Sequence, residues 1–186
     1  SKRGGASFVP KLGLLEKDQV GPSGIPAFHL MPKPRGAISN LAALPVDDEK
    51  QLAGGEVLMA VKAVGINFRD LLNVLGMYPG DPGPPGGDCA GVVVKAGPGV
   101  KHLKPGDAVF GLAGGSLGSH VLVSSQTLVP MPSNLGFEEA ATTPTVFITV
   151  DTAFRQAASL QPGQRALVHA AAGGVGLAAI QMVAAL

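Results

Sequence analysis

A glycine-rich turn near the end of the chain constrains the fold more than any other feature. An apolar run, RALVHAA at residues 165–171, leads into AGGVG at residues 172–176, and an apolar stretch without charges follows. A strand that passes through such a turn into a helix is typical of a dinucleotide-binding unit. The glycines let a pyrophosphate approach the backbone, and the helix N-terminus supplies unpaired N–H groups. Ala171 occupies the first glycine position of the full G-x-G-x-x-G pattern, so a turn that only packs helix against strand stays open as an alternative.

The residues of this turn are the first candidates for a binding site. We predict that a pyrophosphate contacts the backbone of Ala172, Gly173, Gly174, Val175 and Gly176. The apolar run before the turn predicts a buried strand of the parallel-sheet type, and the run after it predicts a helix. One strand and one helix cannot cover their own apolar faces, so a doubly wound sheet needs further units beyond these.

The preceding chain carries β-strand signals separated by tight turns. Residues 55–66, GEVLMAVKAVGI, follow a Gly-Gly pair and alternate in the way a strand does. Further strands are expected at residues 89–97 and 108–112, with two short ones within 120–130. The chain holds 27 glycines and 16 prolines, which recur as Pro-Gly turns between apolar runs. Short strands joined in this way predict a small barrel or sandwich.

Two segments have a helical pattern. Leucines recur at helical spacing in NFRDLLNVLGM, residues 67–77, with Gly76 as the expected C-cap. Residues 134–160 are also helical in pattern, with an interruption at Pro144. The expected fold class is therefore mixed, with a β-rich part followed by the start of an α/β part.

Composition excludes several kinds of partner. Charged residues make up 15% of the chain and the net charge is +1, so neither nucleic acid nor an acidic membrane surface is an expected partner. The apolar segment 166–186 has the length of a membrane span, but the glycine turn in its middle argues against one. The single cysteine, Cys89, excludes an intrachain disulfide and is expected in the core. A reduced, cytoplasmic setting follows most simply.

Four motifs occur together in a familiar order. GINFRDLLNVLGMYPG, CAGVVVKAGPGV, LKPGDAVFGL and VHAAAGGVGLAAIQ closely resemble the medium-chain dehydrogenase/reductase superfamily and, within it, the enoyl reductase domain of a polyketide synthase. The resemblance implies a GroES-like substrate domain, a partly open β-barrel, at residues 25–132. It implies the beginning of a Rossmann domain at 133–186, and residues 1–24 are expected to be a linker. The chain is thus expected to be the first half of a reductase from a megasynthase and to be inactive by itself.

The resemblance also implies an activity. It is the NADPH-dependent reduction of the 2,3 double bond of a trans-2-enoyl thioester, carried on an acyl carrier protein beside other megasynthase domains. Two alternatives remain at this point. One is a quinone oxidoreductase of the same superfamily, and the other is a non-catalytic module.

The resemblance assigns roles to three side chains. Tyr78, the only tyrosine, is the candidate proton donor, because a phenol can protonate an enolate. Asn67 is expected to cap the helix at 67–77 and to lie near the nicotinamide ribose, and Thr149 near the nicotinamide end of the cofactor. The alternatives are a loop aromatic over the pocket mouth for Tyr78 and a buried threonine bonded to its own helix for Thr149.

No metal is expected. Zinc-dependent members of the superfamily carry a Cys at the start of the segment occupied here by NFRD, and a His-Glu pair where this chain has Gly87 and Asp88. With one cysteine and four scattered histidines, the chain also lacks a multi-cysteine zinc pattern.

Overall fold

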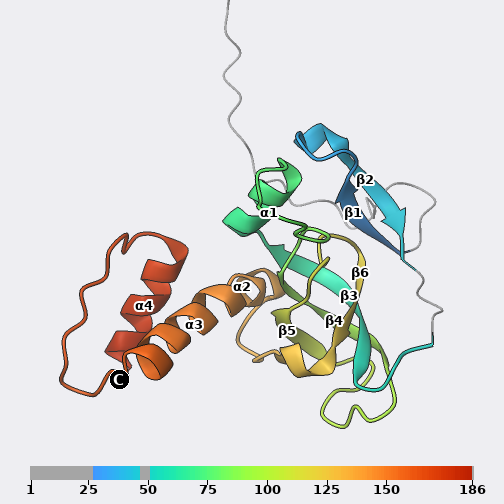
Figure 1. Cartoon of the computed structure of the whole chain (residues 1–186). Helices are drawn as coiled ribbons and strands as arrows, with labels where there is room; N and C mark the ends of the chain where they lie inside the picture. The colour runs from blue at the N-terminus through green and yellow to red at the C-terminus, as the bar shows by residue number, and fades with distance from the viewer. Residues whose placement is uncertain (1–26, 47–50, 186) are drawn as a thin grey trace, which may run out of the picture.

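The computed structural model describes residues 27–46 and 51–185. The segment 1–24, expected to be a linker, lies outside them. The elements follow the order β1, η1, β2, β3, α1, β4, β5, β6, η2, β7, α2, α3, η3, α4 (Figure 1). The predicted fold class is confirmed, because a β-rich unit is followed by a helical one.

The bounds of the elements are as follows. The strands are β1 (Phe28–Pro32), β2 (Leu41–Pro45), β3 (Glu56–Gly65), β4 (Asp88–Ala96), β5 (Ala108–Leu112), β6 (His120–Ser124) and β7 (Leu128–Pro130). The helices are η1 (Ile38–Asn40), α1 (Phe68–Val74), η2 (Ser125–Thr127), α2 (Phe137–Ala141), α3 (Pro144–Asp151), the π-helical η3 (Thr152–Ala157) and α4 (Gly174–Ala184).

Five strands form one antiparallel sheet in the order β6-β3-β4-β5-β7, and β1 pairs with β2 in a separate hairpin. The strands β6 and β7 are the two edges, so the sheet is open rather than a closed barrel. The pairing of β3 with β4 has two register shifts, which increase the local twist. A bridge between His29 and Gly118 connects the hairpin to the chain just before β6, and the N–H of Leu30 donates to the carbonyl of Leu117 beside it.

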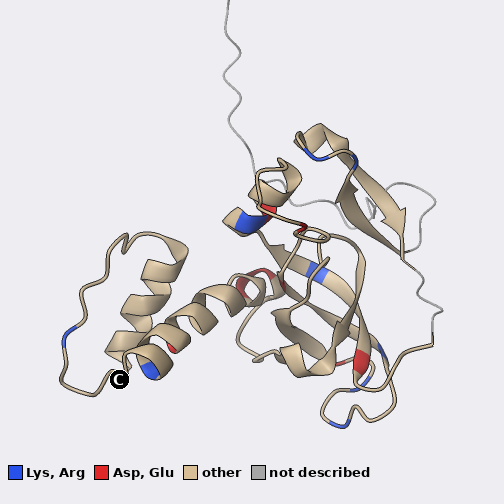
Figure 2. Ribbon diagram, in the orientation of Figure 1, with Lys and Arg blue, Asp and Glu red and all other residues tan. Residues whose placement is uncertain are grey.

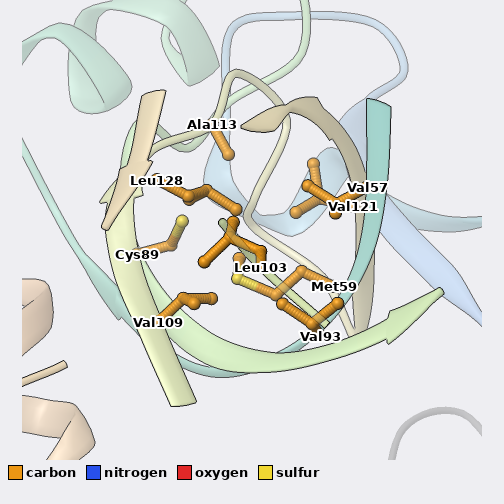
Figure 3. Close-up of a cluster of buried hydrophobic side chains, with 9 residues drawn as sticks. All are labelled: Val57, Met59, Cys89, Val93, Leu103, Val109, Ala113, Val121 and Leu128. Carbon is orange, nitrogen blue, oxygen red and sulfur yellow. The ribbon is translucent and has the colours of Figure 1, made fainter. Parts of the chain in front are cut away.

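The curved sheet surrounds one apolar core, shown in Figure 3. Alternation along β3 sends Val57 and Met59 inward, and both side chains are fully buried. Cys89 on β4 is also fully buried, as expected from the sequence. The cluster comprises Val57, Met59, Cys89, Val93, Leu103, Val109, Ala113, Val121 and Leu128.

The helix α1 begins and ends where the sequence predicts. Asn67 is its N-cap residue, and the backbone N–H of Asn67 donates to Asp70 Oδ2 at 2.9 Å. After the helix, Gly76 has a φ of 68°. The N–H of Gly76 donates to the carbonyl of Asn73, and that of Met77 donates to the carbonyl of Leu72. This pair of bonds is the Schellman arrangement, which satisfies carbonyls at the helix end.

The helix α2 packs on the sheet through small side chains. Ala140 and Ala141 are buried against Ala90 of β4. A Cβ at Gly65, the last residue of β3, would collide with the carbonyl oxygen of Ala141. Only a glycine at that position lets the helix approach the strand so closely.

The helices α3 and α4 lie side by side and extend away from the sheet (Figure 1). They bury Val150, Ala178 and Ala179 between them. The predicted helical segment 134–160 is therefore present, and its interruption falls at Thr142 and Thr143, directly before Pro144.

The strand predicted at residues 165–171 is absent, and this prediction was wrong. These residues form turns and irregular backbone, and Leu167 is 84% exposed. A strand needs a neighbour to pair its N–H and C=O groups. No strand in the described part of the chain lies beside this segment. Local apolarity is therefore not sufficient to form the strand here.

Candidate functional site

A buried carboxylate occupies the place where the sheet meets two helices. Asp88 is the first residue of β4, pairs with Gly65 at the end of β3 and is only 2% exposed. The side-chain amide of Asn67, at the N-terminus of α1, donates to Asp88 Oδ2 at 3.1 Å. A buried charge requires such partners, because an unsatisfied carboxylate away from water is costly.

The other oxygen of this carboxylate bonds to α3. Thr145 donates twice to Asp88 Oδ1, through its backbone N–H at 3.0 Å and its hydroxyl at 2.6 Å. The hydroxyl distance is short for an O–H···O hydrogen bond, and the N–H distance is an ordinary one. Asp88 therefore connects the sheet to the first turn of the helix, across 57 positions of sequence.

The chain of bonds continues along α3 to Thr149. The Thr149 hydroxyl donates to the carbonyl oxygen of Thr145 at 2.7 Å, and Thr149 is exposed. Part of the alternative interpretation is therefore correct, since the hydroxyl bonds to its own helix, but the residue is not buried. The structure brings the two predicted cofactor residues, Asn67 and Thr149, into one hydrogen-bonded series through Asp88 and Thr145.

The glycine turn lies against the same helix. Gly173 is the N-cap residue of α4, and a Cβ at Gly174 would sit 3.4 Å from Val146 Cγ1, one position after Thr145. A cavity of about 420 Å³ opens between α2, α3 and the N-terminus of α4. The first N–H groups of a helix have no partner inside it, so this end can accept an anion. Gly174 is the residue of the turn that lines this cavity, the Glu139 side chain is also among the lining residues, and binding of a pyrophosphate here stays a prediction.

Gly176 has a different role from its neighbours. It is buried, and a Cβ there would collide with the carbonyl oxygen of Ala170 and with Ala171. The third glycine of a dinucleotide fingerprint serves this kind of close packing. By contrast, Ala172, Gly173, Gly174 and Val175 are exposed, as backbone contacts to a ligand require.

Tyr78 lies in the loop after α1. Its half-buried ring is covered by Arg69, whose guanidinium carbon is 5.3 Å from the ring centroid. Arg69 also donates to the carbonyl oxygen of Pro82 at 3.3 Å. Tyr78 thus contacts α1 through Arg69, and Asn67 is the N-cap residue of the same helix. The role of Tyr78 as a proton donor stays a prediction.

A further cavity, of about 600 Å³, lies between β5, β7 and the apolar face of α3. Its walls include Phe110, Leu112, Val129, Phe147 and Ile148, and no ionisable side chain lines it. Ile148, the residue before Thr149, lines this cavity. None of the lining side chains is an acid or a base that could transfer a proton.

The resemblance predicted that zinc ligands are replaced at Asn67 and at the pair Gly87 and Asp88. In the structure Asn67 and Asp88 are bonded to each other. Within residues 27–46 and 51–185, no cluster of three or more His, Cys, Asp or Glu side chains could hold a metal ion. That the reaction is independent of zinc stays a prediction.

Asp88 and Thr145 are the members of this hydrogen-bonded series that sequence reasoning missed. One signal was available for Asp88, because an acid beside the apolar run CAGVVV must find buried partners. Nothing in the sequence indicated that Thr145 would be that partner. Their contact depends on how α3 packs on the sheet.

The charged positions and the helix lengths bear on nucleic-acid binding and on membrane insertion. In Figure 2 the basic and acidic positions are sparse and interspersed over the described ribbon. None of the helices in the described ranges has the length and apolarity needed to cross a bilayer.

Comparison with known proteins gives a consistent result. Residues 53–133 match the alcohol dehydrogenase GroES-like domain. The chain is 42% identical to the pikromycin polyketide synthase component PikAII of Streptomyces venezuelae, in an alignment 198 residues long that covers 97% of this chain and 5% of PikAII. The crystal structure of CurK enoyl reductase matches with a TM-score of 0.79 and 36% identity, covering 86% of this chain and 51% of that one. A quinone oxidoreductase from Pseudomonas syringae pv. Tomato DC3000 matches with a TM-score of 0.72 and 32% identity, covering 86% and 50%.

These matches confirm the resemblance inferred from the motifs. The GroES-like match covers residues 53–133, and the chain resembles the enoyl reductases of the medium-chain dehydrogenase/reductase superfamily. It spans about half the length of the solved relatives and a small fraction of the polyketide synthases.

Proposed function

We propose that the natural polypeptide containing this chain is an NADPH-dependent enoyl reductase. Its substrate is a trans-2-enoyl thioester on an acyl carrier protein, and its partners are the other domains of a cytoplasmic megasynthase. The observation that carries the proposal is the hydrogen-bonded series from Asn67 to Thr149 beside the glycine turn at Gly174. The similarity to PikAII and to CurK enoyl reductase supports the choice of substrate class.

In this proposal some residues bind and orient the cofactor, and one residue transfers a proton. Bound NADPH would supply the hydride that the β-carbon of the enoyl group receives. The exposed N–H groups at the start of α4 hold the pyrophosphate, while Asn67 and Thr149 orient the nicotinamide end. Tyr78 donates its hydroxyl proton toward the α-carbon, so that one hydride and one proton together saturate the double bond.

A quinone oxidoreductase is the second candidate, because a solved member of that class has the same fold over 86% of this chain.

The isolated chain, without the rest of the polypeptide, is the case in which a non-catalytic role applies. Residues 165–171 form no strand in the structure, and the segment leading into the glycine turn therefore has no paired support. We propose that the isolated 186 residues bind NADPH weakly and do not turn over.

The test compares two acceptors with one enzyme preparation. The complete natural polypeptide is mixed with NADPH and either a crotonyl thioester or a quinone, and cofactor oxidation is followed by absorbance. Reduction of the thioester with little reduction of quinone supports the proposal. The opposite preference selects the quinone reductase, and tight NADPH binding by the isolated chain would contradict the proposal of an inactive fragment.

A further inference from the structure

The carboxylate of Asp88 is saturated by donors from two different parts of the fold. Oδ2 accepts from the Asn67 amide, and Oδ1 accepts from the N–H and the hydroxyl of Thr145. These three donors are uncharged, and Asp88 is 2% exposed. Each bond is directional, and the 2.6 Å bond from the Thr145 hydroxyl is the shortest of them.

The contacts between α2 and the sheet are mainly apolar. Ala140 and Ala141 are buried against Ala90, and Gly65, which has no Cβ, lets the helix approach the strand closely there. Apolar contacts of this kind are non-directional, so they bring α3 to the sheet but define its orientation less strictly than the hydrogen bonds to Asp88 do. Because α3 extends away from the sheet (Figure 1), its orientation depends on what holds its first turn.

We propose that Asp88 is a positioning residue that sets the geometry between Asn67 and Thr149. The inference rests on the proposed function, in which these two residues orient the cofactor. Asp88 would act through these two residues, because it holds the N-terminus of α1 and the first turn of α3 to one pair of oxygens. Thr149 lies one helical turn beyond Thr145 and is bonded to it, so a displacement at Thr145 reaches Thr149 directly.

Hydride transfer is sensitive to such displacement. A shift of about 1 Å in a reacting group can cost on the order of a hundredfold in rate. Loss of one of three bonds is a smaller perturbation, because the backbone N–H of Thr145 and the Asn67 amide remain. We therefore expect a change at Thr145 to lower kcat by about tenfold, which is less than the hundredfold loss given for a shift of about 1 Å.

The experiment uses Thr145→Val in the complete natural polypeptide, because valine keeps the shape and removes the hydroxyl. Thr145→Ser restores the donor to Asp88. Thr127→Val is the matched control, since the exposed Thr127 hydroxyl donates to the carbonyl of Ser124 and not to Asp88. We expect Thr145→Val to lower kcat about tenfold with less than about a threefold change in the KM for the thioester, and Thr145→Ser to recover most of the rate.

A second readout does not depend on turnover. Amide hydrogen exchange in the cofactor-free protein should accelerate over residues 145–151 in Thr145→Val and stay as in the wild type in Thr127→Val. Wild-type exchange in Thr145→Val overturns the inference whatever the reaction is. Wild-type kcat in Thr145→Val, on a wild-type enzyme that reduces enoyl thioesters, also overturns it.

The same design separates the two proposals. A wild-type enzyme without enoyl reduction refutes the proposed function, and the kcat comparison is then made on the acceptor that it does reduce. Asp88→Asn breaks the bond to Asn67, and a second substitution can restore it. Its new amide opposes the Asn67 amide, and the exchange variant Asn67→Asp with Asp88→Asn restores a donor–acceptor pair. Failure of that pair to exceed Asp88→Asn in kcat counts against positioning through this bond.

Discussion

The guanidinium carbon of Arg69 lies 5.3 Å from the centroid of the Tyr78 ring. A cation at this distance is attracted to the ring face, and a second bond from Arg69 to the carbonyl of Pro82 limits its movement. The ring is thus held between α1 and the loop that follows it. The contact involves the ring face only and leaves the hydroxyl outside it, so ring and hydroxyl can be tested separately.

Tyr78→Phe should lower kcat for enoyl reduction by about a hundredfold, because the hydroxyl is lost while the ring and its contact with Arg69 stay. Steady-state kinetics with NADPH and a crotonyl thioester measure the change. Thermal unfolding of the variant should match the wild type. Unchanged turnover would remove Tyr78 from the mechanism and favour a loop aromatic that only packs.

Gly176→Ala should destabilise the protein by about 1–3 kcal/mol, because the new Cβ collides with the Ala170 carbonyl beneath α4. Gly174→Ala is the matched variant on the same helix turn, where the nearest atom to a Cβ is Val146 Cγ1 at 3.4 Å. Denaturant unfolding of both compares their free energies. Equal stabilities would mean that the turn adjusts without cost and that Gly176 is not needed for packing.

Arg35→Met should cost more stability than Asp81→Asn. The Arg35 side chain donates to Asn73 Oδ1 at 2.9 Å and to the carbonyl of Gly83 at 3.0 Å, and Asn73 is 2% exposed. Loss of the first bond removes the donor of the buried Asn73 Oδ1, at about 1–3 kcal/mol, whereas the Gly83 carbonyl still accepts from Asn73 Nδ2. The ion pair with Asp81 is 3.4 Å long and 84% exposed on the Asp81 side, so its loss should change the free energy of unfolding by less than about 1 kcal/mol. Similar losses for the two variants would contradict this ranking.

Cys89 makes stability depend on alkaline pH. Burial raises the pKa of the Cys89 thiol from 9.0 to about 12, and the nearby charge of Asp88 adds to the increase. Between these values the unfolded thiol loses its proton while the folded one keeps it. The free energy of unfolding must therefore fall as pH rises from 9.0 toward about 12, by up to about 1.4 kcal/mol per pH unit.

The comparison variant is Cys89→Ala, whose free energy of unfolding should fall less steeply over the same pH range. Urea unfolding at several pH values gives the two slopes. Below pH 9.0 the slopes should agree, and the native thiol should react with disulfide reagents far more slowly than the unfolded one. Parallel slopes above that pH would show that the thiol is not shielded as the structure indicates.

Much of the fold follows from local pattern. The strand at residues 55–66, the helix at 67–77 and its Gly76 end were all predictable, since side-chain alternation, leucine spacing and glycine turn chemistry act over a few residues. Burial of Cys89 follows from the same alternation along an apolar strand. The family and its fold class were also identifiable from four motifs in order.

The sequence alone failed at residues 165–171 for a physical reason. Their apolar run satisfies the pattern of a buried strand, but strand formation requires a neighbouring backbone to pair with, and the described structure offers none there. Side-chain pattern reports what a segment could bury. It does not report whether a partner is present.

By itself, the sequence determined the candidate residues Asn67, Tyr78 and Thr149 and the glycine turn, because each stands in a recognisable local pattern. The tertiary structure alone decided that Asp88 joins Asn67 to α3, since the bond to Thr145 spans 57 residues. A contact of that kind has no local signature. It exists because the packing of α2 on the sheet brings the first turn of α3 to a buried carboxylate that had to find donors.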